Sequence, residues 1–203
     1  KKSSNLLKKK DTNSELITLK EEDQLFWYFY IAKYGYDQYK ILDHKFTHEK
    51  NIKISNIEKV KQNKDLLKQN KLKISEFEVD LLNSKKISLK TLQGLSIYNN
   101  LNIYYIENKI FYFFNYNDNN ESIIIYKDNK NYSCNINPSS EIVNNINNNY
   151  YYVENINKPI NAISNYKLAE LVDIAKKLGI KEKLDSGKVK NKNMLYEEIK
   201  LKF

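Results

Sequence analysis

Residues 88–114 read SLKTLQGLSIYNNLNIYYIENKIFYFF, and the character of the chain changes in the middle of this stretch. Before Asn99 the apolar residues recur at helical spacing behind Ser88, a residue type that favours a helix start. After Asn100 the chain consists of short runs rich in β-branched and aromatic residues, which polar turn residues separate. The stretch therefore predicts an α+β fold, with a mostly helical N-terminal half up to about residue 99 and a sheet beyond it.

We expect this sheet to be an antiparallel β-meander packed on the helices. Its candidate strands are the runs Leu101–Glu107, Ile110–Asn115, Ser122–Lys127 and Asn131–Ile136. Asn-rich and Asp-Asn segments between the runs supply the turns. The single cysteine, Cys134, lies in the last run and is interpreted as a small core residue. The polar tract Asn144–Asn149 is predicted to be a surface loop.

Upstream, the segment Asp23–Tyr34 (DQLFWYFYIAKY) is apolar on nearly all sides. This pattern predicts a buried central helix that ends at Gly35. The acidic triplet Glu21–Asp23 lies at its start, where the helix dipole favours negative charge. Residues 37–70 have a helical but interrupted pattern, and Ser75–Glu78 matches a capping box that would begin a further helix.

Downstream, Pro159 marks a boundary. A helix is expected over Asn165–Leu178 with Ser164 as its cap, then a polar loop at Lys181–Lys190, then a short helix at Asn191–Lys200. The chain is therefore divided into a basic flexible arm at 1–19, an α+β main domain at 20–158 and a small C-terminal helical hairpin at 160–203.

The charge of the chain is carried by lysine without arginine. The sequence has 34 lysines, no arginine, 30 asparagines and a net charge of +9. AT-rich codons explain part of this bias, but the placement is uneven: residues 1–20 and 159–203 each carry +4, whereas residues 91–158 carry −2. Basic ends favour polyanionic partners. Because lysine is a point charge rather than a bidentate fork, binding would be directed at the phosphate backbone and would be salt-sensitive.

Several classes of protein are excluded by composition. The 41% hydrophobic content is too high for full disorder, and a single cysteine cannot form an intramolecular disulfide. We expect no membrane span, because no apolar run approaches the length that one requires. Residues 1–10 lack the apolar run of a secretory signal, so we expect an intracellular or virion location rather than secretion.

The C-terminal segment carries a resemblance. Residues 166–200 read YKLAELVDIAKKLGIKEKLDSGKVKNKNMLYEEIK. The pair Leu168 and Leu171, the Leu178–Ile180 closure, the Ser186–Lys188 turn and the apolar Leu195 resemble a SAP-type helix-extended-helix module, or the similar small N-terminal domain of Rho-like factors.

That resemblance implies a small helical module that contacts the DNA backbone, with Lys188, Lys190 and Lys192 as phosphate contacts. Helix N-termini and nearby lysines both attract phosphate. The segment between the helices is longer than in the family, and Glu182 and Asp185 dilute its charge. The alternative interpretation is a helical hairpin that docks on a neighbouring surface.

A looser resemblance covers most of the chain. The stretches DQLFWYFYIAKYGY, NKDLLKQNKLKISEFEVDLL and SLKTLQGLSIYNNLNIYYIENKIFYFF are similar to proteins of large AT-rich DNA viruses of the giant-virus type. We therefore expect a non-enzymatic, DNA-associated virion or nucleoprotein component that binds duplex DNA without sequence preference. Lys8, Lys9 and Lys10 of the basic arm would add phosphate contacts. The alternative is a structural or assembly protein, such as a minor capsid or scaffold component that binds other virion proteins.

No catalytic residue, cofactor or metal site is predicted. The order of elements is similar to papain-like and OTU-like cysteine proteases, but Asp23 and Asn131 stand where the Cys and His would be needed, so that interpretation allows at most a catalytically dead domain. No glycine-rich phosphate-binding or dinucleotide-binding motif is present. His44 and His48 lack the HExxH order and a third ligand.

Overall fold

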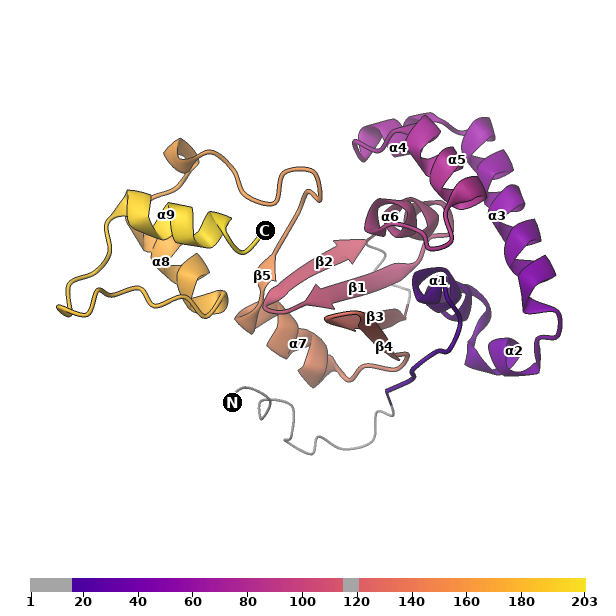
Figure 1. Ribbon diagram of the computed structural model, residues 1–203, viewed down its shortest axis with the longest axis horizontal. Coiled ribbons are helices and arrows are strands. Elements are labelled where there is room, and N and C mark those ends of the chain that lie inside the picture. The colour runs from indigo at the N-terminus through magenta and orange to yellow at the C-terminus, as the bar shows by residue number, and fades with distance from the viewer. Residues whose placement is uncertain (1–15, 115–120) are drawn as a thin grey trace.

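The computed structural model describes residues 16–114 and 121–203 (Figure 1). Its helices are α1 (Gln24–Tyr34), α2 (Tyr36–Ile41), α3 (Lys45–Gln62), α4 (Asp65–Gln69), α5 (Ile74–Asn83), α6 (Leu89–Tyr98), α7 (Ser140–Asn149), α8 (Leu168–Lys177) and α9 (Lys192–Lys200). Its strands are β1 (Asn102–Glu107), β2 (Ile110–Phe114), β3 (Ser122–Asp128), β4 (Asn131–Asn135) and β5 (Tyr151–Tyr152). The α+β class is confirmed: α1 to α6 precede the sheet in the chain, α7 lies between β4 and β5, and α8 and α9 follow β5.

The sheet is mixed, so the predicted antiparallel meander is wrong. The strand order is β4-β3-β1-β2-β5. The hairpins β1–β2 and β3–β4 are antiparallel, but β3 lies parallel to β1, with Asn102 opposite Ser122, and β5 lies parallel to β2. Turn residues specify each hairpin locally, but they do not specify the edge on which the second hairpin adds. Burial of consecutive residues in β1 and β3 agrees with their interior positions, since such strands are covered on both faces.

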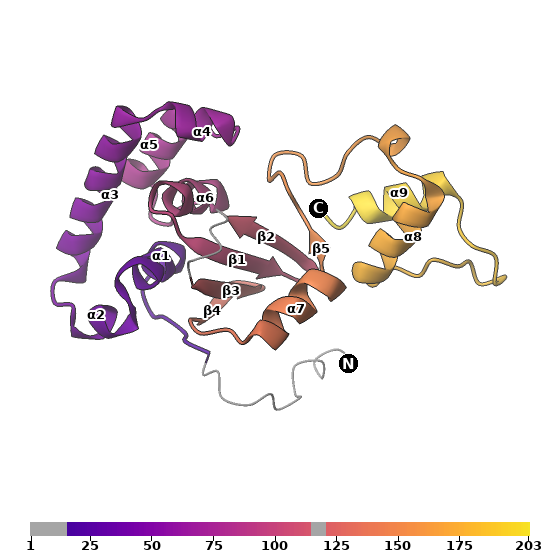
Figure 2. The ribbon, with the colours of Figure 1, turned by 180° about the vertical axis from the view of Figure 1, so that it is seen from behind.

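Helices cover both faces of the sheet. Figures 1 and 2 show α1 and α6 on one side and α7 on the other. Most residues of α1 are buried, and Asp23 caps its first turn by accepting a hydrogen bond from the Phe26 amide. Gly35 ends α1 with φ +90°, a conformation that glycine adopts readily, as predicted. The helices α3, α4 and α5 form an outer layer beside α1 and α6 (Figure 1).

The asparagine tract is helical, so the predicted surface loop at Asn144–Asn149 is wrong. Ser139 caps α7 by accepting a hydrogen bond from the Ile142 amide. Ile142, Val143 and Ile146 form an apolar stripe on α7: Ile146 belongs to a buried cluster with Tyr104 of the sheet, and the other two pack against that cluster. The exposed asparagines hide this apolar stripe in the sequence, and burial of the stripe overcomes their weak helix propensity.

The start of the main fold lies earlier than residue 20. Ile17 and Leu19 are buried, and Ile17 exchanges two backbone hydrogen bonds of 2.8 Å with Cys134 on β4. The Tyr28 hydroxyl also donates to the Ile17 carbonyl. The last residues of the arm expected at 1–19 therefore belong to the core. Cys134 itself is fully buried, as expected.

Two other helix starts differ from the predictions. α5 begins at Ile74 with Lys73 as its cap residue, so Ser75 lies inside the helix rather than capping it. α8 begins at Leu168, and Ser164 lies in a separate short 3₁₀ turn, Ile163–Asn165. In α5 the buried residues Phe77 and Leu81 follow Ile74 at helical spacing, and packing of that face sets the boundary.

The C-terminal helices pack on each other beside β5 (Figure 1). Their shared core contains Leu171, Ala175, Leu195 and Ile199. Ile110 of β2 belongs to the same cluster, so the helix pair shares apolar contacts with the edge of the sheet. In the described part of the chain, no helix is both long and apolar enough to cross a membrane.

Candidate functional site: the lysine-bearing segment between α8 and α9

The segment between α8 and α9 forms a short hairpin. Lys183 and Val189 make an antiparallel bridge, and the Lys190 amide donates to the Glu182 carbonyl at 2.9 Å. The Leu184 amide donates to the Lys188 carbonyl at 2.8 Å. Gly187 lies at the tip with φ +82°. These backbone bonds hold the segment in an ordered, projecting shape.

The structure separates the three lysines that the resemblance selects. Lys188 is exposed beside the tip. Lys192 is half-buried at the first position of α9, next to the cap residue Asn191, whose side chain accepts from the Met194 amide at 2.9 Å. Lys190 is committed elsewhere, because its ammonium lies 2.6 Å from the Glu198 carboxylate and its side chain is only 11% exposed. Lys190 therefore anchors the hairpin to α9.

Charges around the hairpin are unequally paired. Four acidic residues of this part have partners: Asp173, Glu197 and Glu198 form ion pairs with lysines, and Glu170 accepts from the Lys167 amide. Within the described ranges, several lysines near α8 and α9 have no ion pair: Lys177, Lys181, Lys183, Lys188, Lys192 and Lys202. Glu182 and Asp185 also form no ion pair in the described structure, but the unpaired lysines outnumber them, so this part of the chain presents a net positive charge. Lys8, Lys9 and Lys10 lie outside the described residues.

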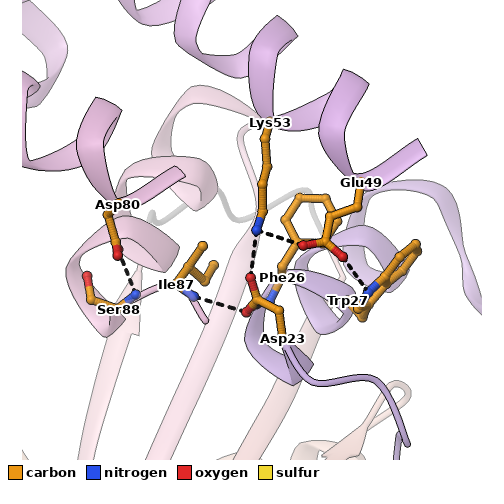
Figure 3. Close-up of polar contacts among 8 residues, drawn as sticks. All are labelled: Asp23, Phe26, Trp27, Glu49, Lys53, Asp80, Ile87 and Ser88. Carbon is orange, nitrogen blue, oxygen red and sulfur yellow. Dashed lines mark hydrogen bonds and ion pairs between the residues drawn. The ribbon is translucent and has the colours of Figure 1, made fainter. Parts of the chain in front are cut away.

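A second polar cluster, which no local sequence pattern predicts, is buried at the start of α1 (Figure 3). The Asp23 carboxylate lies 2.8 Å from the Lys53 ammonium and accepts the Ile87 amide at 3.1 Å. Lys53 also lies 2.7 Å from Glu49, whose carboxylate accepts from the Trp27 indole at 3.1 Å. Burial alone would lower the pKa of Lys53, but its hydrogen bonds and charge contacts with both carboxylates outweigh burial and raise it. The ammonium therefore stays charged.

A third cluster adjoins the Asp23 cluster. The Tyr39 hydroxyl lies 2.7 Å from the Glu21 carboxylate, and the Lys45 ammonium lies 2.6 Å from it. Lys45 also lies 3.8 Å from the centre of the Tyr39 ring. Burial alone would raise the pKa of Glu21, but hydrogen bonds from Lys45 and Tyr39 hold it below its usual value. The acidic triplet before α1 thus consists partly of tertiary ion-pair partners, beyond the dipole role that the sequence indicated.

These two clusters join α1 to α2, α3 and the α5–α6 connection. Every buried side-chain nitrogen and oxygen that the structure describes has a hydrogen-bond partner. Asp23 and Asn131 occupy the starts of α1 and β4, where the protease resemblance would place the nucleophile and the base. The Asp23 carboxylate already accepts hydrogen bonds from one ammonium and two amides. The arrangement therefore holds these helices and the connecting segment together.

The described cysteine is buried, whereas both described histidines lie at the surface. Burial raises the pKa of the Cys134 thiol, which opposes thiolate formation. His44 and His48 are both exposed at the start of α3. Among the described residues, no group of three or more His, Cys, Asp or Glu side chains is placed to hold a metal ion.

Comparison with known proteins found no matching family model, no matching curated protein and no matching solved structure.

Proposed function

We propose that the chain is a nucleic-acid-associated protein that binds the phosphate backbone of duplex DNA through the hairpin at 181–191 and the start of α9. The proposal rests on one observation: Lys183, Lys188 and Lys192 carry no ion pair in the described structure, whereas Lys190 is neutralised by Glu198. The role would be that of a nucleoprotein or virion component, without sequence specificity.

The physical case combines two sources of positive potential. The first turn of a helix exposes amide hydrogens and carries the positive end of the helix dipole. α9 begins beside the hairpin, so a phosphate near Lys192 would meet both the amides and the lysine. Lysine ammonium groups add charge without reading bases, which predicts similar affinity for unrelated DNA sequences.

The test is a binding titration of the full chain with an unrelated set of DNA duplexes across a salt series of about 50–200 mM. The triple variant K183Q/K188Q/K192Q should weaken binding and reduce the log–log salt slope by roughly 2–3, since each lost phosphate contact removes about 0.9 from it. The matched control K40Q/K73Q/K176Q removes the same net charge from lysines that already form ion pairs.

The control should retain most of the wild-type affinity and slope. Equal losses of DNA affinity in the two triple variants would show that overall charge explains the effect, and would reject the hairpin as the binding element. A wild-type chain that does not bind at the lowest salt would reject the proposed function. The variant K8Q/K9Q/K10Q measures the contribution of the N-terminal lysines separately.

A second function, as an assembly protein, is favoured by two large apolar side chains on the surface at the α2–α3 junction. Ile41 is 71% exposed and Phe46 is 81% exposed. Contiguous apolar patches mark protein interfaces, so substituting both residues together tests whether they form one. The variant I41S/F46S should abolish concentration-dependent association in sedimentation experiments; a wild-type chain that remains monomeric at high concentration excludes self-assembly through this surface.

A further inference from the structure

A pocket of about 670 Å³ lies between α5, the start of α6 and residues 156–157. Leu72, Phe77, Val79, Leu89 and Ile156 give it a mostly apolar lining. Sites for small organic molecules have volumes of about 300–1,000 Å³ and a similar lining with a few polar groups. The proposed DNA contact does not involve this pocket.

The acidic groups of the pocket are already committed. Glu76 lies 2.7 Å from the Lys73 ammonium. Asp80 accepts the Ser88 amide at 2.7 Å (Figure 3). Burial alone would raise the pKa of Asp80, but hydrogen bonds from neighbouring groups, Thr91 first among them, hold it below its usual value. Glu76 is therefore neutralised by Lys73, whereas Asp80 is held by hydrogen bonds and forms no ion pair among the described residues.

Two lysines of the lining form no direct ion pair within the described residues, although the charge of Lys90 helps to lower the pKa of Glu76. Lys71 and Lys90 make no ion pair in the part of the chain that is described. The lining holds three lysines and two carboxylates, so its net charge is +1 and favours an anionic group. A neutral apolar molecule would leave both ammonium groups without a partner.

The backbone at Lys71 has the left-handed conformation that ends α4. Lys71 has φ +57°, a conformation that glycine and asparagine adopt far more readily than lysine. It follows α4, where its amide donates to the Lys68 carbonyl at 2.9 Å and its own carbonyl accepts from the Asn157 side chain at 3.4 Å. The Leu72 amide also donates to the Leu67 carbonyl at 2.9 Å, so the left-handed residue closes the end of α4 and fixes where the Lys71 side chain enters the lining.

We propose that this pocket binds a single-chain aliphatic carboxylate, whose chain lies on Phe77 and Val79 and whose acid group pairs with the rim ammonium groups of Lys71 and Lys90. The chain gains free energy by leaving water for the apolar floor. A charged hydrogen bond at the partly buried rim is stronger than a neutral one. Neither contribution depends on the lysines at 183–192.

The first experiment titrates the full chain by calorimetry with three probes of equal chain length: decanoate, decanol and decylammonium. Decanoate should bind with one-to-one stoichiometry, about tenfold tighter than decanol, because loss of one charged hydrogen bond has about that effect. Decylammonium should bind most weakly. Absence of saturable decanoate binding, or equal affinity for the three probes, overturns the proposal.

Two substitutions on α5 provide a matched pair. Val79 lines the pocket and is 56% exposed, whereas Leu82 is 59% exposed on the same helix and does not line it. Val79→Asp should abolish decanoate binding by placing a carboxylate beside the ligand, and Leu82→Asp should leave it unchanged. Equal effects of the two substitutions contradict the assignment of the site.

Lys71→Gly separates binding from folding. Glycine relaxes the backbone at this position, so the melting temperature should stay constant or rise. Decanoate affinity should nevertheless fall several-fold, because one of the two ammonium groups is lost. An unchanged affinity in a stably folded Lys71→Gly variant rejects Lys71 as a ligand contact. Because DNA binding is measured separately, failure of either proposal leaves the other intact.

Discussion

The Lys53 ammonium lies 2.8 Å from the Asp23 carboxylate at the start of α1, and both side chains are almost completely buried. Asp23 also accepts the amides of Phe26 and Ile87, so one carboxylate connects α1, α3 and the segment before α6. Removing such a partner leaves a charge in a site that water cannot reach, and this asymmetry makes the pair sensitive to single substitutions.

Lys53→Met should therefore lower the free energy of unfolding by about 3–5 kcal/mol, because Asp23 and Glu49 lose their cation. Urea denaturation at neutral pH measures the change. Lys200→Met is the control, since Lys200 is exposed and lies 3.8 Å from Glu197; it should cost about 0–1 kcal/mol. Similar losses in the two variants would show that the buried pair contributes no more than a surface pair.

Acid should destabilise the fold partly through Glu21. Its folded-state pKa is lowered from 4.5, so its contribution to stability is present above the unfolded value and is lost as pH falls through the folded value. Glu21→Gln should therefore remove about 1 kcal/mol at neutral pH and flatten the decline in stability between about pH 5 and pH 3. Thermal unfolding of both proteins across this pH range measures the effect. An unchanged acid profile in Glu21→Gln would assign the acid sensitivity to other carboxylates.

The contact between α5 and α6 requires a glycine. A Cβ atom at Gly94 would lie 2.6 Å from an edge carbon of the Phe77 ring. Gly94→Ala should destabilise the fold by about 1–3 kcal/mol, although alanine is the better helix former. In a Phe77→Leu background the same substitution should be close to neutral, because the obstructing ring is gone. Chemical denaturation of the wild-type chain, the two single variants and the double variant measures these changes. Additive changes in the free energy of unfolding would exclude the steric explanation.

Residues before α1 should contribute to stability in an alternating pattern. Ile17 is buried and paired with Cys134, whereas its neighbour Leu16 is 53% exposed. Ile17→Ala should cost about 2–5 kcal/mol, the usual range for a buried aliphatic residue, and Leu16→Ala should cost little. Unfolding midpoints of the two variants provide the comparison. Equal midpoints would place Ile17 outside the cooperative core.

The elements that could be predicted have a strong local signal. The apolar run of α1 and its Gly35 end, the helix behind Ser88 and the four aromatic or β-branched runs of β1 to β4 all appear in the structure. The sequence does not predict α7, because its apolar stripe is short and surrounded by asparagine. The wrong start for α5 arose because Ser75 has the chemistry of a cap, while the burial of the Ile74 face set the boundary.

The candidate site was only partly accessible from the sequence. The basic character of the segment between α8 and α9 is visible in its residues, but the pairing of Lys190 with Glu198 is not. Helical spacing relates residues three and four positions apart, and Lys190 lies outside the helix that holds Glu198. The pocket beside α5 likewise depends on residues 156–157, which follow the sheet in the chain.

The sequence by itself determined the α+β class, the position of the change from helix to strand, the buried character of α1 and the basic ends. These properties follow from local periodicity, turn chemistry and charge. The tertiary structure decided the parallel pairing of β3 with β1, the ion pair between Asp23 and Lys53, and which lysines remain free of carboxylates. Those features depend on contacts between residues far apart in the chain, whose free energy comes from burial and from charge pairing in three dimensions.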